Sequence, residues 1–170
     1  MTDTPWQLRI LDSLKRANVR QVTYVPDAGH SMLIDAVHDD PDMVPVVLTT
    51  EEEGIAVNCG AWLGGDRSVL LMQSSGVGNC INTLSRVQNC RFPFLTLVTM
   101  RGEAGEFNTW QCPMSEATQT CFEAMGVSVV RCNTANDVDT VLDRATKQVF
   151  EDENAIAVLL SQRLIGEKKW

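Results

Sequence analysis

The fold class can be read first in residues 68–79, SVLLMQSSGVGN, which carry a strand, a tight turn and a helix start in immediate succession. Residues 68–72 are almost wholly apolar and of strand length, which predicts a strand that is buried on both faces of a sheet. Gly76, Val77 and Gly78 then turn the chain into a helix that is expected over residues 79–88. A buried strand that leads directly into a helix is typical of parallel α/β sheets.

The same alternation continues in both directions from this segment. Strands are expected over residues 21–25, 43–48, 68–72, 94–99, 127–130 and 155–160, and helices over residues 6–17, 31–37, 51–63, 79–88, 115–125 and 138–150. Gly64 and Gly65 are expected to end the third helix, and Asn136 or Asp137 to cap the last one. The pattern predicts one domain over residues 1–170, an α/β three-layer sandwich with a six-stranded parallel sheet and helices on both faces.

Composition excludes several classes of protein. The chain has 170 residues, of which 44% are hydrophobic and 21% charged, so it is neither a disordered tail nor a collagen-like repeat nor a coiled coil. No apolar run approaches the roughly 18 residues that a membrane span needs, and the first residues lack the pattern of a secretory signal. We therefore expect a cytoplasmic protein without membrane contact. The net charge of −8 disfavours binding to nucleic acid.

The cysteines and histidines do not form a recognisable metal motif. Six cysteines are scattered without a CxxC pair, and in a chain of this length without an export signal we expect free thiols. His30 and His38 lie too far from cysteines in the sequence to complete a zinc site. Metal binding by this chain alone is not expected.

Ligands of such folds bind at the carboxyl ends of the strands, which directs attention to four loops. The first, VPDAGH (residues 25–30), is either a tight turn in which Asp27 or Ser31 caps the next helix, or a turn that places His30 at the mouth of a cleft. The second, TTEEEG (residues 49–54), opens a helix with three carboxylates. They are either a solvated face that opposes the helix dipole, or include one acid that points toward the sheet or a neighbouring subunit.

The third and fourth loops offer glycines and polar side chains. Residues 72–79, MQSSGVGN, let a ligand approach the backbone closely, but a plain strand-to-helix turn explains them equally well, and they lack the features of a phosphate-binding loop. The polar stretch from residue 100 to residue 113 is the longest irregular segment expected. Loops of that length within one domain are more often functional than not.

Taken together, these loops resemble one family. The order VPDAGH, TEEEGIAVNCGAWLGG, LLMQSSGVGN, RFPFLTLVTMRGE and WQCPM is similar to the pyrimidine-binding domain of thiamine diphosphate-dependent 2-oxo acid decarboxylases. More narrowly, it resembles the separate α subunit of sulfopyruvate decarboxylase and the corresponding half of phosphonopyruvate decarboxylase. The resemblance runs from about residue 8 to residue 160. It implies a thiamine diphosphate-binding fold of the pyrimidine-binding type.

The resemblance also implies a role for one of the three glutamates. In the family a glutamate at a helix start hydrogen-bonds N1′ of the cofactor's aminopyrimidine, so that the 4′ nitrogen becomes an internal base for the thiazolium C2–H. Setting Trp62 against the family's aromatic position selects Glu52, whereas a shift of one residue selects Glu51 or Glu53. The chemistry of decarboxylation then belongs to the cofactor, which the protein positions.

The other site residues come from the same resemblance. Those expected to contact the cofactor are Pro26, Gln73, Ser75 and Gly76, beside Glu52. Those expected to contact the substrate are His30, Ser74, Asn108 and Gln111. The expected substrate is a small 2-oxo acid of the sulfopyruvate or phosphonopyruvate kind, and the expected products are an aldehyde and CO₂. Arg101 and His30 are the cleft-loop candidates for meeting a second anion of such a substrate.

One family motif is absent from this chain. The cofactor's diphosphate needs Mg²⁺, whose site the family marks with GDG and a later asparagine, and residues 64–66, GGD, are not that motif. The resemblance therefore implies a β subunit that carries the diphosphate- and Mg²⁺-binding domain, in an α/β hetero-oligomer such as α2β2 or larger.

Two other interpretations remain open. A non-catalytic α/β module that binds a small molecule or a protein would explain the missing metal motif without a partner. A Rossmann-type nucleotide binder is disfavoured, because the first strand leads into VPDAGH rather than a glycine-rich turn.

Overall fold

A computed structural model describes residues 4–166 of the chain. Its sheet has six strands in the order β2-β1-β3-β4-β6-β5, and every neighbouring pair is parallel. The strands are β1 (Val19–Tyr24), β2 (Val44–Val47), β3 (Arg67–Gln73), β4 (Phe94–Thr99), β5 (Ser128–Cys132) and β6 (Ala155–Leu160). The predicted six-stranded parallel sheet is confirmed.

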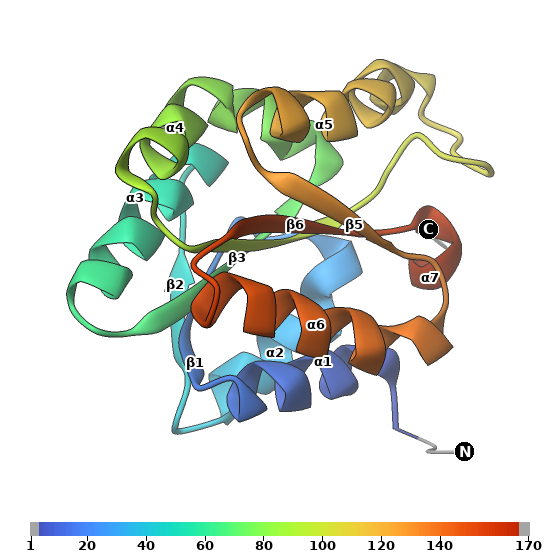
Figure 1. Ribbon diagram of the computed structural model, residues 1–170. Coiled ribbons are helices and arrows are strands. Elements are labelled where there is room, and N and C mark those ends of the chain that lie inside the picture. The colour runs from blue at the N-terminus through green and yellow to red at the C-terminus, as the bar shows by residue number, and fades with distance from the viewer. Residues whose placement is uncertain (1–3, 167–170) are drawn as a thin grey trace.

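Helices cover both faces of this sheet, as Figure 1 shows. The longer helices are α1 (Trp6–Arg16), α2 (Ser31–Asp39), α3 (Glu51–Leu63), α4 (Val77–Cys90), α5 (Cys112–Ala124) and α6 (Val138–Phe150). Helices α1, α2 and α6 lie on one face, and α3, α4 and α5 on the other. The three-layer sandwich expected from the sequence is thereby confirmed.

Two apolar clusters, one on each face, hold the layers together. Strand β3 contributes to both, because Val69 and Leu71 belong to the cluster under α1 and α6, while Leu70 and Met72 belong to the cluster under α3 and α4. All four side chains are fully buried. The strand is therefore buried on both faces, as its apolar run predicted, since alternate side chains point to opposite faces.

Two glycines of α3 give a matched test of this packing. A Cβ added at Gly54 would lie 2.5 Å from Leu70 Cδ1 and 2.8 Å from Leu48 Cδ1, whereas one added at Gly60 meets nothing within 4 Å. Overpacking should outweigh the gain in helix propensity, so Gly54→Ala should lower the free energy of unfolding by about 1–2 kcal/mol. Gly60→Ala should raise it by about 0.5–1 kcal/mol. Urea denaturation measures the free energy of unfolding of both variants. Equal effects of the two substitutions would contradict the prediction.

Several helix ends differ from the expected residues. Helix α4 begins at Val77, after the short 3₁₀ helix η2 (Ser74–Gly76), and α5 begins at Cys112, because Pro113 is tolerated in a first helical turn. Asp137 lies at the N-cap position of α6, as expected, but its side chain makes no cap hydrogen bond there. Thr134 caps the 3₁₀ turn η4 (Ala135–Asp137) that leads into α6. It forms a capping box with Asp137, whose carboxylate accepts from the Thr134 backbone N–H at 3.0 Å. The expected stop after α3 is confirmed by Gly64 at the C-cap.

Three further short helices were not predicted: η1 (Ala28–His30), η3 (Thr109–Gln111) and α7 (Gln162–Ile165). Segments of three or four residues are too short to carry a helical period in sequence. Helix α7 nonetheless matters for the site, because it lies beside the loop that follows β4. No helix within residues 4–166 combines the length and apolarity needed to cross a bilayer.

Candidate active site

The four loops named from the sequence follow β1, β2, β3 and β4 at the carboxyl edge of the sheet. The chain leaves β1 outward to β2 and then returns to β3 on the other side of β1, so the loops after β1 and β3 diverge at adjacent strands. Such a switch point is where open α/β sheets bind ligands. The strand order thus brings residues that are far apart in sequence into one site.

Asp27, in the loop after β1, is the centre of this site. Its Oδ1 accepts a hydrogen bond from Gln73 Nε2 at 2.9 Å. Its Oδ2 accepts from the Thr99 hydroxyl at 2.7 Å and from the Gly29 backbone N–H at 3.1 Å. The carboxylate therefore joins the ends of β1, β3 and β4. From the sequence, Asp27 is a possible helix cap within one of the four loops, and its position at the end of a strand is the signal that marks it as a site residue.

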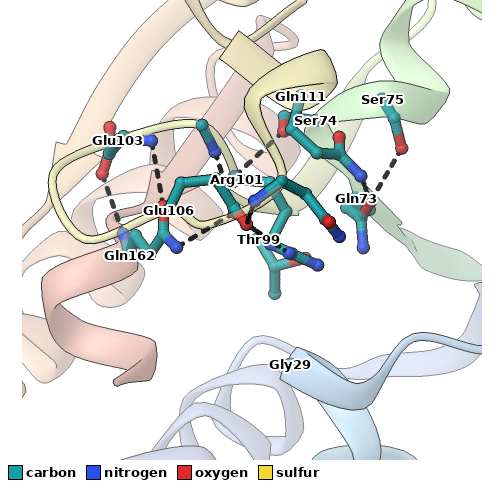
Figure 2. A network of polar contacts seen from close by, with 12 residues as sticks. Gly29, Gln73, Ser74, Ser75, Thr99, Arg101, Glu103, Glu106, Gln111 and Gln162 are labelled. Carbon is teal, nitrogen blue, oxygen red and sulfur yellow. Dashed lines mark hydrogen bonds and ion pairs between the residues drawn. The ribbon is translucent and has the colours of Figure 1, made fainter. Parts of the chain in front are cut away.

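Predicted site residues from two loops meet beside Asp27. Gln73 Oε1 accepts from the Ser75 hydroxyl at 2.8 Å and from Gln111 Nε2 at 3.2 Å (Figure 2). Gln111 is 4% exposed, and its Oε1 is buried with no hydrogen-bond partner within residues 4–166. Ser74 is also buried, and its hydroxyl accepts from the Arg101 backbone N–H at 3.0 Å. The structure thus unites Gln73, Ser75 and Gln111 directly.

Arg101 is held by Glu106 within the loop after β4. Arg101 Nε and Nη2 donate to the two Glu106 oxygens at 2.6 and 2.8 Å, and the Glu106 side chain is 1% exposed. The Arg101 guanidinium lowers the pKa of Glu106 to about 2, with help from the backbone N–H groups of Gly102 and Asn108. The guanidinium that the sequence offered for a substrate anion is thus already paired, and no sequence pattern indicated Glu106.

Glu103 and Glu106 of this loop are hydrogen-bonded to Gln162 of α7 (Figure 2). Gln162 Oε1 accepts from the Glu103 backbone N–H at 2.9 Å, while the Glu103 carboxylate accepts from the Gln162 backbone N–H at 2.8 Å. Gln162 Nε2 also donates to Glu106 at 3.1 Å. The reciprocal bonds fix the loop, and a cavity of about 400 Å³ lies between it, α7 and the loop after β1. Asp27, Thr99, Arg101, Phe107 and Gln162 are among the residues that line this cavity.

The three glutamates of α3 have three different environments. The Glu53 carboxylate accepts from the Thr49 backbone N–H at 2.8 Å, and the Glu52 carboxylate from the Thr50 hydroxyl at 3.2 Å. Both contacts lie within the loop that precedes the helix. Glu51 instead reaches another element, since its carboxylate accepts from Asn79 Nδ2 of α4 at 2.9 Å. A Cβ at Gly76 would lie 2.3 Å from Glu51 Oε1, so only glycine admits the carboxylate there.

His30, Pro26 and Asn108 take less central places. His30 is 1% exposed, its Nε2 lies 3.2 Å from the Leu97 carbonyl oxygen, and burial lowers the pKa of its imidazole. The expectation that His30 lies at the mouth of a cleft is therefore wrong, because the turn directs the ring into the sheet. Pro26 is exposed beside Asp27. Asn108 is linked to the site through its backbone N–H, which donates to Glu106 at 3.0 Å.

The six cysteines carry free thiols. Cys80 is fully buried next to the acidic start of α3, and burial, with the nearby charges of Glu51 and Glu52, raises the pKa of its thiol to about 12. Its thiol is therefore protonated at neutral pH and packs as an apolar group. Among the described residues, no three histidine, cysteine, aspartate or glutamate side chains gather as metal ligands would.

Comparisons with known proteins agree with this architecture. The α subunit of sulfopyruvate decarboxylase from Methanococcus maripaludis is 35% identical over 152 residues, which cover 89% of each chain. Phosphonopyruvate decarboxylase from Streptomyces viridochromogenes is 37% identical over 98 residues, which are 57% of this chain and 25% of that protein. No family model matches the chain.

A solved structure shows the same fold. A protein from Mycobacterium smegmatis that is assigned to the thiamin diphosphate-dependent enzymes superposes with a TM-score of 0.72, at 15% sequence identity. The match covers 94% of this chain and 31% of that one, so this chain spans less than a third of the larger protein. The pyrimidine-binding type of fold and the resemblance stated from the loops are thereby confirmed. By its identity to the subunit from M. maripaludis over nearly its full length, the chain belongs to the family of sulfopyruvate decarboxylase α subunits.

Proposed function

We propose that the protein is the α subunit of a heteromeric thiamine diphosphate-dependent decarboxylase that converts a small 2-oxo acid into an aldehyde and CO₂. The family supports the reaction class, since its named members are sulfopyruvate decarboxylase subunits and phosphonopyruvate decarboxylase matches as well. The partner would be a β subunit that holds the cofactor's diphosphate through Mg²⁺, in an α2β2 or larger assembly.

The observation that carries the proposal is the direction of the Glu51 side chain. The cofactor role requires a carboxylate that leaves its own helix and reaches the glycine-bearing loop after β3. Glu51 meets this requirement through Asn79 and Gly76, whereas the carboxylates of Glu52 and Glu53 accept from Thr50 and Thr49 of their own loop. We therefore propose Glu51 for the role, in preference to Glu52, the residue that the sequence register selected.

The residues around Glu51 suit an aminopyrimidine. Gly76 has no side chain, so the Glu51 carboxylate can lie against the loop after β3, where a Cβ would be only 2.3 Å from Glu51 Oε1. Pro26, Ser75 and Gly76 would hold the ring together with the glutamate. When bound, thiamine diphosphate supplies an acceptor for the electrons that remain when CO₂ departs. The chain's own contribution is to fix a carboxylate that keeps one proton in place on the cofactor.

The substrate end of the site would lie on the other side of Gln73. Ser74, Asn108 and Gln111 come from the two loops that meet there, which supports their proposed contact with the 2-oxo acid. His30 has no surface to offer a substrate, so we leave it out of the proposed contacts.

Reconstitution tests the function. The chain would be co-expressed with a candidate β subunit that contains the GDG motif, and CO₂ release would be measured with thiamine diphosphate, Mg²⁺ and a panel of 2-oxo acids that includes sulfopyruvate and phosphonopyruvate. We expect turnover only when both subunits and the cofactor are present. Turnover by either subunit alone, or none with any 2-oxo acid by a complex that binds the cofactor, would reject the proposal.

A further inference from the structure

Asp27, Gln73 and Gln111 form a chain of hydrogen bonds whose direction can be deduced. Asp27 and Gln73 are 46 residues apart in sequence and Gln73 and Gln111 are 38 apart, yet each pair is in direct contact. The chain starts at a carboxylate and ends at a buried amide. Each side-chain amide has one end that donates and one that accepts, so fixing the first member fixes the rest.

The carboxylate is itself fixed. Its Oδ2 accepts from the Gly29 backbone N–H, which can only donate, and from the Thr99 hydroxyl. A Cβ at Gly29 would lie 2.9 Å from Asp27 Oδ2 and 2.8 Å from Thr99 Cγ2, so the turn is closed tightly around the carboxylate. A carboxylate offers acceptors alone, and Gln73 must therefore turn its Nε2 toward it.

The accepting end of Gln73 is then fully used. Both the Ser75 hydroxyl and Gln111 Nε2 donate to Gln73 Oε1, which has two lone pairs. One of the two hydrogens on Gln73 Nε2 is taken by Asp27, and the other has no partner within residues 4–166. Gln73 is half-buried rather than enclosed. What this side chain can still offer to a ligand is a single N–H donor.

We infer that Asp27 is a positioning residue that fixes Gln73 as a hydrogen-bond donor toward an acceptor oxygen of the 2-oxo acid. The inference rests on the proposed function and deepens it, because it assigns Gln73 to the substrate rather than the cofactor. A 2-oxo acid carries three acceptor oxygens on two adjacent carbons. A side-chain amide recognises these oxygens best when it cannot rotate and exchange its N–H end for its C=O end. An amide free to rotate would offer an acceptor equally often.

The substitution Asp27→Asn would reverse the direction of these hydrogen bonds rather than break them. The new asparagine can keep its oxygen on Thr99 and Gly29 while its Nδ2 faces Gln73. Gln73 would then turn its oxygen toward that Nδ2 and its nitrogen toward Ser75 and Gln111, whose amide can rotate in response. Every bond would remain, but Gln73 would offer the ligand an acceptor. We expect the melting temperature of Asp27→Asn to stay within a few degrees of the wild type.

The direction of the hydrogen bonds between Asp27, Gln73 and Gln111 can be measured on the subunit alone. In ¹⁵N-labelled protein, the side-chain NH₂ signals of Gln73, identified by their loss in Gln73→Leu, should shift clearly in Asp27→Asn. Asp66→Asn is the matched control, because Asp66 is an exposed acid paired with Arg20 at the opposite edge of the sheet. Gln73 signals that do not differ between the wild type and Asp27→Asn would overturn the deduced direction, whether or not the protein proves to be a decarboxylase.

Kinetics of the reconstituted enzyme test the recognition step. Loss of a hydrogen bond to a charged group should raise KM for the 2-oxo acid about tenfold to 100-fold in Asp27→Asn. The concentration of thiamine diphosphate that gives half-maximal activity should change less than threefold. An unchanged KM, or a shift confined to the cofactor, would overturn the assignment. A complex without any activity would count against the proposed function. The direction of the hydrogen bonds would then be decided by the NMR signals of Gln73 in the subunit.

A double variant separates positioning from mere stability. In Asp27→Asn with Gln73→Glu, the asparagine donates to the new carboxylate, which also accepts from Ser75 and Gln111, so all contacts are satisfied and the melting temperature should match the wild type. Position 73 then has no N–H for the substrate, and KM should remain high. Wild-type KM in this double variant would show that Asp27 has a structural role only.

Discussion

Replacing Glu51 by glutamine should lower kcat of the reconstituted decarboxylase at least 100-fold. Positioned groups that hold or move a proton typically contribute 10²–10⁴-fold to a rate. Glutamine keeps the size of the side chain and an oxygen that can accept from Asn79 Nδ2, as the carboxylate does at 2.9 Å. The substitution removes the charge and replaces one carboxylate oxygen by an NH₂ group. The loss should therefore appear in turnover, with a melting temperature close to that of the wild type.

The neighbouring acids supply matched controls for this prediction. Glu52→Gln and Glu53→Gln remove the same charge from the same helix turn, and Thr50 and Thr49 can still donate to the glutamine oxygen. We expect each to retain at least a third of wild-type kcat. If Glu52→Gln lost activity and Glu51→Gln did not, the register chosen from Trp62 would be right and the choice made from the Asn79 contact wrong.

The second large effect concerns the buried ion pair of the loop after β4. Glu106→Gln leaves the guanidinium of Arg101, whose side chain is 10% exposed, without its counter-charge. Breaking one partner of a buried pair costs about 3–5 kcal/mol. In a domain of this size that corresponds to a melting temperature lower by about 6–20 °C. Thermal unfolding followed by circular dichroism measures the shift.

The same pair predicts a dependence on pH. Arg101 holds the pKa of Glu106 at about 2, below its ordinary value of 4.5. A carboxyl group whose pKa is depressed in the folded protein stabilises it fully above the ordinary value and loses that contribution as the pH falls toward the depressed one. The difference in unfolding free energy between wild type and Glu106→Gln should thus shrink from about pH 4.5 downward. A difference that stays constant from pH 7 to pH 3 would contradict the role of this charge.

An exposed ion pair provides the comparison. Arg16 and Asp143 contact each other at 2.8 Å, but their side chains are 55% and 54% exposed. Pairs of this kind contribute about 0–1 kcal/mol, because water screens both charges. Asp143→Asn should therefore change the melting temperature by no more than about 4 °C.

Much of the fold followed from local patterns. The ranges predicted for α3, β4, α6 and β6 agree with the structure at both ends. Some of these ends coincide with a residue that stops an element, such as Gly64 after α3. Apolar periodicity fixes which side of an element is buried, and this information lies within a few turns of the chain. The predicted parallel sheet rests on the same alternation.

The candidate site followed only in part. The loops that carry it could be named because strands of a parallel sheet end at one edge. The hydrogen-bond partners within those loops could not be predicted from the sequence, because Asp27 contacts Gln73 only as a result of β1 and β3 being neighbours in the sheet. The same limit applied to His30, whose ring turns inward toward Leu97 of β4.

By itself the sequence determined the six strands and the six longer helices, the layering, the four loops at the carboxyl edge of the sheet and the family. The tertiary structure decided which of three adjacent glutamates reaches α4, that Arg101 is paired with Glu106, and that Asp27 is the hub of the site. The reason is physical. The apolar pattern that predicts burial lies within a single helix or strand. A hydrogen bond between two loops depends instead on the order of the strands and on side-chain directions that bring donor and acceptor within about 3 Å.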